Sequence, residues 1–229
     1  MIASVGVLVG GAAPLVAAEA LYLYGLHHID EPPPVAARAL PAPVMNAFWL
    51  AGGERLPATV ERLAPWKYGW AVAYDGAWLT KRRPGEQMAS LAARAWMSRQ
   101  PRTQRTRWAV TSWAATVWAS RHWDAGQMTR FWVEGAWFGR GARGLDAASE
   151  RYFGRASSSL TWSEVALLAA LTAAPARLDP ACFPDRATKA RNGILAQLRT
   201  SGALTPADHD AAVAQPLGVR ELPCDRRGP

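Results

Sequence analysis

The segment from Phe138 to Pro180 constrains the fold more than any other part of the chain. It begins with a glycine-rich turn and continues into a helix that reaches Tyr152-Phe153-Gly154. An alanine- and leucine-rich helix follows and closes at Ala174-Pro175, with Thr161 in a suitable place to cap its start. Helices joined by glycine turns, without an alternating strand pattern between them, predict a mainly α-helical domain.

The remaining segments show the same preference for helix. A weak helix broken by Pro57 is expected over 47–62. The aromatic segment 67–80 is expected to form either a hairpin or an irregular aromatic segment. Further helices are predicted over 86–97, 108–123, 124–135, 145–153, 163–173, 185–200 and 206–214. Tryptophans recur every five residues in 108–123 and therefore spread around that helix. Such a helix is either a buried core helix or touches lipid, and both interpretations stay open.

The N-terminus carries a topological signal, because Glu19 is the only charge between Ile2 and Leu26. This length meets the roughly 20 residues that a helix needs to cross a bilayer. We interpret residues 1–27 as a transmembrane signal-anchor, residues 28–43 as a proline-rich linker and residues 44–229 as the folded domain. A cleaved signal peptide is a weaker alternative, because no Lys or Arg precedes the long apolar run. A buried helix of a soluble protein is the other alternative.

The net charge of +8 and the sequence pI of about 10.2 favour an anionic partner, such as acidic lipid, pyrophosphate or nucleic acid. A generally basic composition without a specific partner is the alternative. No nucleic-acid-binding motif is present, so a nucleic-acid partner is not expected. Cys182 and Cys224 lie in no metal-ligand spacing, and either pair in an oxidising compartment or remain two separate thiols.

Several short motifs in the last third of the chain follow one another in a recognisable order. They are Gly139-Arg140-Gly141-Ala142 with Gly144, Tyr152-Phe153-Gly154, Leu160-Thr161-Trp162-Ser163-Glu164, Ala174-Pro175, Asp179-Pro180, Arg191, Leu195, Gly202 with Leu204-Thr205, and Pro216-Leu217. This ordered set resembles the end of the catalytic domain of the peptidoglycan glycosyltransferases (glycosyltransferase family 51). These are the lipid II polymerases of penicillin-binding proteins and their monofunctional relatives.

The resemblance implies a lysozyme-like α-helical glycosyltransferase domain, here preceded by one transmembrane helix. It implies polymerisation of lipid II at the outer face of the bacterial cytoplasmic membrane, with lipid II, the growing glycan chain and membrane lipid as partners, and with other cell-wall synthesis proteins as further candidates. The 229 residues leave no room for a transpeptidase domain, so a monofunctional polymerase is expected. Relatives often use a divalent cation, but the sequence shows no cluster of metal ligands and no evident cofactor.

In this family a glutamate deprotonates the acceptor hydroxyl, and cationic side chains bind the departing pyrophosphate. The family's first motif is not reproduced here. Counting back from Gly85, where the family's second motif begins, places Glu54 at the catalytic position, whereas alignment of the apolar segment 47–51 places Gly52 there. Glu54 is therefore the candidate general base, and a surface glutamate in a glycine-rich turn is the alternative.

The substrate-binding candidates follow from the same resemblance. Arg94 and Arg102 match cations that contact the pyrophosphate in relatives, and Arg140 in the glycine-rich turn is assigned to the same pyrophosphate or glycan site. Gln127 aligns with a later glutamate and can donate or accept hydrogen bonds without acting as an acid or base. Because the first three motifs have diverged, the alternative function is a catalytically impaired pseudoenzyme that binds the lipid-linked precursor or a cell-wall synthesis partner.

Overall fold

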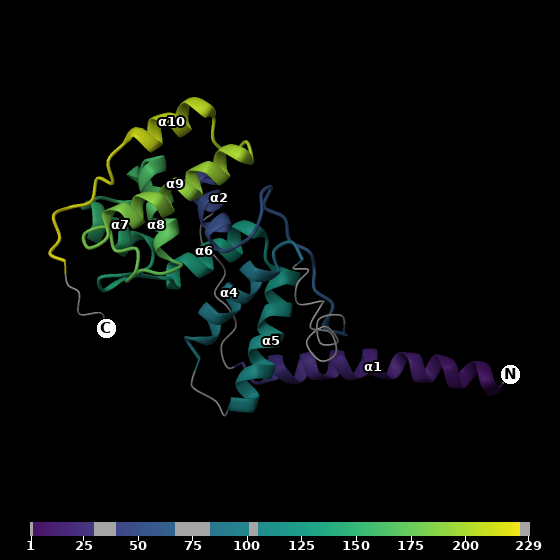
Figure 1. The fold of residues 1–229 in the computed structure, drawn as a ribbon. Helices are drawn as coiled ribbons and strands as arrows, with labels where there is room; N and C mark the ends of the chain where they lie inside the picture. The colour runs from purple at the N-terminus through teal and green to yellow at the C-terminus, as the bar shows by residue number, and fades with distance from the viewer. Residues whose placement is uncertain (1, 30–39, 67–82, 101–104, 225–229) are drawn as a thin grey trace. The chain divides into compact units, whose positions relative to one another are not determined.

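The computed structural model describes residues 2–29, 40–66, 83–100 and 105–224 of the chain (Figure 1). The chain divides into two compact units, one with Met1–Val35 and Thr59–Met128, the other with Ala36–Ala58 and Thr129–Pro229. Each unit is described by itself. The last of the three boundaries, between Met128 and Thr129, lies within helix α6 (Ala125–Gly135). The predicted hairpin over 67–80, most of the linker and Arg102 lie outside the described residues.

The first unit contains α1 (Ile2–His27), α4 (Glu86–Met97) and α5 (Arg105–His122), and both α1 and α4 pack against α5 (Figure 1). Gly25 allows the close approach of α1, because a Cβ atom there would lie 2.6 Å from Cβ of Ala114. Tyr22, Leu63, Ala114 and Val117 form a small buried cluster around this crossing. The two helices therefore approach most closely at Gly25 and Ala114, and larger apolar side chains pack around that point.

Helix α5 packs against its two neighbours mainly through small residues. Its buried positions are mainly small, and include Ala114, Ala115 and Ala119. Trp113 and Trp118 are only partly buried, and they contact buried aromatic residues of the two neighbours, Tyr22 of α1 and Trp96 of α4. The five-residue spacing thus does not mark a seam of tryptophans. The tryptophans are instead distributed around the helix, and its small residues allow α1 and α4 to pack closely.

Glu19 has a partner on α5. Its carboxylate lies 3.3 Å from the guanidinium of Arg121, which also donates a hydrogen bond to the carbonyl of Leu63 and lies 5.0 Å from the ring centre of Tyr22. Within the described residues, no helix is both long enough and apolar enough to cross a membrane. The transmembrane helix over 1–27 therefore stays a prediction.

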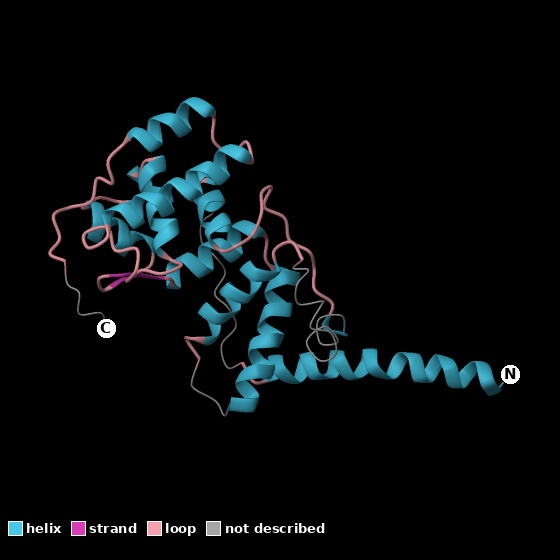
Figure 2. Ribbon diagram, in the orientation of Figure 1, coloured by secondary structure: helices cyan, strands magenta, loops and turns pink. Residues whose placement is uncertain are grey.

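The second unit contains the helices α2 (Ala42–Ala51), α7 (Leu145–Phe153), α8 (Trp162–Leu171), α9 (Pro184–Thr200) and α10 (Pro206–Ala214), and a short hairpin of β1 (Trp137–Gly139) and β2 (Ala142–Arg143). Helix α8 is buried from Ser163 to Leu171, and α2, α7, α9, α10 and β1 all contact it. Figure 2 shows how little strand accompanies these helices. The expectation of a mainly α-helical domain is confirmed.

The helix ends follow from local sequence. Thr161 and Glu164 form a capping box at the start of α8, and Thr205 accepts a hydrogen bond from the Asp208 amide at the start of α10. The predicted bounds of 86–97, 145–153 and 206–214 match α4, α7 and α10. The weak helix over 47–62 was placed too late. It occupies Ala42–Ala51 instead, because prolines suit a first helical turn and a pair of glycines follows Ala51.

Cys182 and Cys224 form a disulfide with 4.9 Å between their Cα atoms. They are 42 residues apart, so the bond closes a loop that contains α9 and α10. Closing a loop of this length restricts the unfolded chain and typically stabilises a fold by about 2–4 kcal/mol. The two cysteines are therefore paired and are not separate thiols. Disulfides are typical of exported proteins.

Candidate functional site

The glycine-rich turn and the Tyr152-Phe153-Gly154 motif meet in the second unit. The Tyr152 hydroxyl donates a 2.8 Å hydrogen bond to the carbonyl of Phe138, and the ring is fully buried. Burial raises the pKa of Tyr152 from 10.0 to about 12. Because the unfolded chain would release this proton first, the neutral phenol favours folding up to about pH 10 and loses that contribution as the pH approaches 12. The motif is therefore an architectural contact between α7 and the hairpin.

Gly139 lies at the centre of this contact and provides a prediction. Its φ is +87°, and an added Cβ atom would lie 3.2 Å from both the Tyr152 hydroxyl and Cβ of Pro175. Gly141 has a similar φ of +78° but nothing within 4 Å. We expect both alanine variants to lose about 1–2 kcal/mol from backbone strain, and Gly139→Ala to lose at least about 1 kcal/mol more from overpacking. Thermal unfolding of both variants measures the difference, and equal losses would contradict this account of the turn.

Arg140 stands at the tip of the hairpin with a φ of +53°. Its guanidinium pairs with Asp179 at 2.8 Å and donates a hydrogen bond to the carbonyl of Pro223 at 3.0 Å. Both side chains of the pair are largely buried, being 10% and 13% exposed. Arg140 thus joins the hairpin to the Asp179-Pro180 loop and to the C-terminal segment. These contacts give it a structural role, and its assignment to a pyrophosphate or glycan site stays a prediction.

Glu54 lies in the tight turn that ends α2. Its amide donates to the carbonyl of Trp49 at 3.3 Å, and the indole of Trp49 donates to the carbonyl of Arg55 at 2.9 Å. Gly53 has a φ of +87°, a backbone conformation that suits glycine. The side chain of Glu54 is half-buried, and Gly52 lies two residues before it in the same turn. Both sequence alignments therefore place the base position in this one turn, where Glu54 carries the carboxylate.

The anchoring of this turn is internal to the second unit. Helix α2 buries Val44, Ala47, Phe48, Trp49 and Leu50. Phe48 packs edge-on against Trp132 and Phe138, with ring centres 6.3 and 6.0 Å apart. The hydrophobic core thus fixes the end of α2 from which the Glu54 turn departs.

Arg94 belongs to the first unit and lies on the last turn of α4, with an exposed side chain. An exposed guanidinium can reach a phosphate group in solution, and it also interacts favourably with the negative end of its own helix. Arg102 lies outside the described residues. Of the two predicted pyrophosphate-binding cations, the structure therefore describes only Arg94.

Gln127 has a clear local function at the start of α6. Its backbone amide donates to the Asp124 carboxylate at 2.8 Å, and its side-chain oxygen accepts from the Asp124 amide at 2.9 Å. This reciprocal pair is a capping box. The Asp-x-x-Gln spacing could have identified it from sequence. A contact between Gln127 and substrate stays a prediction.

Sequence reasoning missed two features of the second unit. Asp179 is the partner of Arg140, although the two residues are 39 positions apart and only the fold brings them together. Arg191, placed among the pattern residues, is 2% exposed and donates to Ser163, Val213 and Gln215. Hydrophobic periodicity counts arginine as a polar residue, so the helical pattern of α9 gives no indication that Arg191 is buried.

No three His, Cys, Asp or Glu side chains in the described part of the chain lie close enough together to hold a metal ion. The described residues therefore contain no cluster of side chains that could bind the divalent cation implied by the family resemblance.

The transglycosylase family model matches residues 86–199, from the start of α4 to the last turn of α9. The chain is similar to penicillin-binding protein 1A of Aquifex aeolicus, with 37% identity over 98 residues that cover 43% of this chain and 14% of that protein. It is also similar to penicillin-binding protein 1C of Escherichia coli, with 25% identity over 90% of this chain and 29% of that protein.

Among solved structures, the crystal structure of penicillin-binding protein 1A from Haemophilus influenzae is 21% identical, with a TM-score of 0.39 over 60% of this chain and 17% of that chain. The chain thus spans less than a third of the length of each of these relatives. The match of residues 86–199 contains the hairpin, the Tyr152-Phe153-Gly154 motif and the capped helix α8 whose contacts are described above. The chain belongs to the transglycosylase family.

Proposed function

We propose that this chain polymerises lipid II into glycan strands at the outer face of the bacterial cytoplasmic membrane. The observation that carries the proposal is the match of residues 86–199 to the transglycosylase family. The match covers α4 to α9, which carry Arg94, Gln127 and Arg140. Lipid II supplies both the glycan donor, linked to a lipid pyrophosphate, and the acceptor sugar.

In the proposed reaction the Glu54 carboxylate accepts the proton of the acceptor hydroxyl. The hydroxyl oxygen attacks the anomeric carbon of the donor, and the bond from that carbon to the pyrophosphate breaks. The pyrophosphate leaves with the bonding electron pair, and the proton remains on Glu54 until solvent removes it. A general base of this kind must lie within hydrogen-bond reach of the hydroxyl. The short, internally bonded turn that carries Glu54 supports this role, because it restricts the backbone from which the carboxylate extends.

The leaving pyrophosphate gains negative charge as the bond breaks, so fixed cations stabilise the transition state more than the bound substrate. We assign this task to Arg94 and Arg102. Arginine keeps its charge at all working pH values and can bind two phosphate oxygens at once. The exposed position of Arg94 on the last turn of α4 supports its access to a lipid-linked substrate.

The proposed location has two supports. Helix α1 is 26 residues long, and Leu15, Val16, Leu21, Leu23 and Tyr24 are exposed along its described part. Exposed apolar residues on a helix of this length suit a lipid environment, and we propose α1 as the membrane anchor. The Cys182–Cys224 disulfide fits the oxidising side of the membrane. Glu19 lies toward the C-terminal end of α1, where its pair with Arg121 offsets the cost of a charge near the lipid interface.

Incubation of the purified full-length chain with lipid II tests the proposal directly. We expect glycan polymer on a gel that resolves chain length, and release of the lipid pyrophosphate in equal measure to the bonds formed. If the chain binds lipid II in detergent but yields neither polymer nor lipid pyrophosphate, the polymerase proposal is wrong and the chain is a binding protein for the precursor.

The role of Arg94 gives a second prediction. We expect Arg94→Gln to lower kcat/KM for lipid II by about 10–100-fold, because one charged donor to the leaving group is lost. Arg99→Gln is the matched control, since Arg99 is also an exposed cation just beyond the same helix, and we expect a change of less than about twofold. Initial rates of polymerisation measure both variants. Equal losses for the two would mean that only general positive charge matters here.

A further inference from the structure

A groove of about 470 Å³ opens on the second unit, where the start of α2, the start of α8 and the face of α10 meet. A groove of this size is within the range of sites for small ligands. Its described lining is Pro41, Pro43, Val44, Ser157, Ser158, Leu160, Thr161, Trp162, Val165, Asp208, Ala211, Ala212 and Gln215. None of these residues belongs to the set assigned above to glycosyl transfer.

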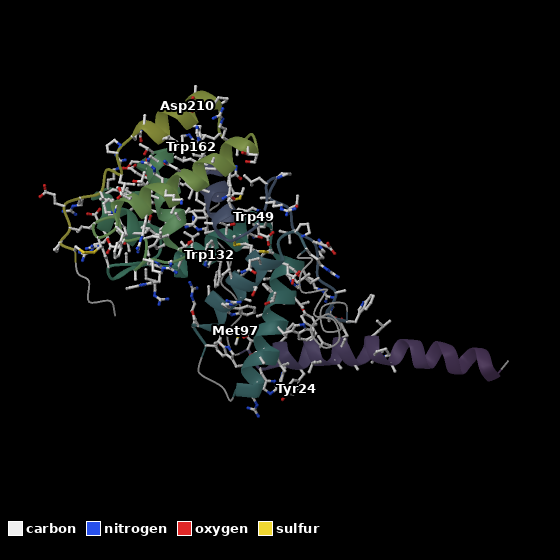
Figure 3. All side chains as sticks on the ribbon, in the orientation of Figure 1. Tyr24, Trp49, Met97, Trp132, Trp162 and Asp210 are labelled. Atoms are coloured by element: carbon white, nitrogen blue, oxygen red, sulfur yellow. A yellow bond between two sulfur atoms is a disulfide. The ribbon has the colours of Figure 1, made fainter. Side chains whose placement is uncertain are left out.

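The wall that α8 contributes is aromatic. Trp162, labelled in Figure 3, is the first residue of α8. It is half-buried, lines the groove and packs against the main core of the unit. Val165 follows on the same helical face, and Val44 and Ala212 are buried beside it. An indole in this setting presents a flat, electron-rich face, which attracts the weakly positive C–H groups of a ring packed against it.

The rim is polar and lies around the indole. Ser158, Thr161, Asp208 and Gln215 supply hydroxyl, carboxylate and amide groups. Asp208 accepts a hydrogen bond from the hydroxyl of Thr205 on its Oδ2 atom, and a carboxylate has about four acceptor positions in all. The amide group of Gln215 carries two N–H donors. The rim therefore has both acceptors and donors for a ligand that is rich in hydroxyl groups.

The charge of the groove narrows the ligand class. Asp208 is the only charged side chain in its described lining, although the whole chain carries a net charge of +8. Phosphate or pyrophosphate would meet a carboxylate rather than a cation, so a lipid-linked pyrophosphate does not fit. A flat apolar platform with a rim of hydroxyl, amide and carboxylate groups matches the two chemical faces of a sugar ring.

We propose that this groove binds an uncharged stretch of glycan, with one sugar ring stacked on Trp162 and its hydroxyl groups bonded to Asp208 and Gln215. The identity of the glycan as the product strand rests on the polymerase function proposed above. The site would hold a strand after transfer and so favour repeated addition to the same strand. It takes part in no bond formation.

Calorimetric titration of the purified full-length chain with the uncharged tetramer of N-acetylglucosamine tests the site. We expect wild-type protein to bind it, and Trp162→Ala to bind at least about tenfold more weakly, as for other central aromatic contacts. Trp137→Ala removes an indole that is 41% exposed on β1 and should bind as wild type does. Asp208→Asn keeps the shape of the rim and should weaken binding by about threefold or more, which covers the case in which Trp162→Ala fails to fold.

The outcomes separate this inference from the proposed reaction. Polymerisation of lipid II without tetramer binding, or with equal binding by wild type, Trp162→Ala and Asp208→Asn, overturns the glycan groove and leaves the polymerase intact. Tetramer binding that depends on Trp162 in a chain that makes no polymer supports the groove and overturns the polymerase. Tighter binding of inorganic pyrophosphate than of the tetramer, lost in the same variants, would also overturn the inference.

Discussion

Replacement of Glu54 by glutamine is expected to lower the rate of lipid II polymerisation by about 10²–10⁴-fold, because general-base catalysis typically contributes that much. Glutamine has nearly the same shape as glutamate but cannot accept the hydroxyl proton. The backbone bond from the Glu54 amide to the Trp49 carbonyl does not involve the side chain, so the turn should remain folded. Initial rates at saturating lipid II measure the effect on kcat.

Glu150→Gln is the matched control for this experiment. Glu150 is an exposed carboxylate on α7, and its replacement removes one negative charge at a site unconnected with the proposed chemistry. We expect its rate to stay within about twofold of wild type. Binding of lipid II should persist in Glu54→Gln, since the residue acts on a proton rather than on affinity. A Glu54→Gln variant with wild-type activity would remove Glu54 as the base.

Replacement of Arg191 by methionine is expected to destabilise the second unit by about 3–6 kcal/mol, since hydrogen bonds to charged donors contribute about 1.5–3 kcal/mol each and at least two carbonyls would lose theirs. The guanidinium donates to the hydroxyl of Ser163 at 2.9 Å, the carbonyl of Gln215 at 2.7 Å and the carbonyl of Val213 at 3.1 Å. Burial lowers the pKa of Arg191, and the carbonyls at the negative end of α10 favour its charged form.

Thermal unfolding of Arg191→Met measures this loss. Methionine is also a long, unbranched side chain, so the change in buried volume is small. Arg199→Met on the same helix is the control. Its side chain is 49% exposed and lies 3.9 Å from Asp210, so its pair is weak and we expect a change within about 0.5 kcal/mol. If both variants unfold at the same temperature, the hydrogen bonds of Arg191 contribute little and α10 is held by its apolar contacts.

The assignment of site residues followed family alignment, and the structure adds local contacts that the alignment does not contain. Gln127 caps α6 through Asp124, and Arg140 pairs with Asp179. Alignment of the chain with the family motifs indicates neither contact. The capping box has a local sequence signature, whereas the Arg140–Asp179 pair depends on a loop that returns 39 residues later.

The tryptophan-rich helix shows the same distinction within one element. Its periodicity indicated a helix with apolar residues on all sides, and that was sound. Which residues would face the neighbouring helices was not determined, because small residues such as Ala114 give no hydrophobic signal of their own. The close crossing at Gly25 selects them, since only a small side chain fits opposite a backbone.

The sequence by itself determined where most helices begin and end, and it identified the family. Capping residues, prolines and glycines act over three or four positions, so their effects are present in any stretch of chain that contains them. Only the tertiary structure decided that Cys182 pairs with Cys224, that Arg191 is buried and that Trp162 lines a groove with Asp208. The residues that these features bring together are 22 to 46 positions apart in the chain. They arise from the packing of α9 and α10 on α8, which depends on side-chain shape rather than on local sequence pattern.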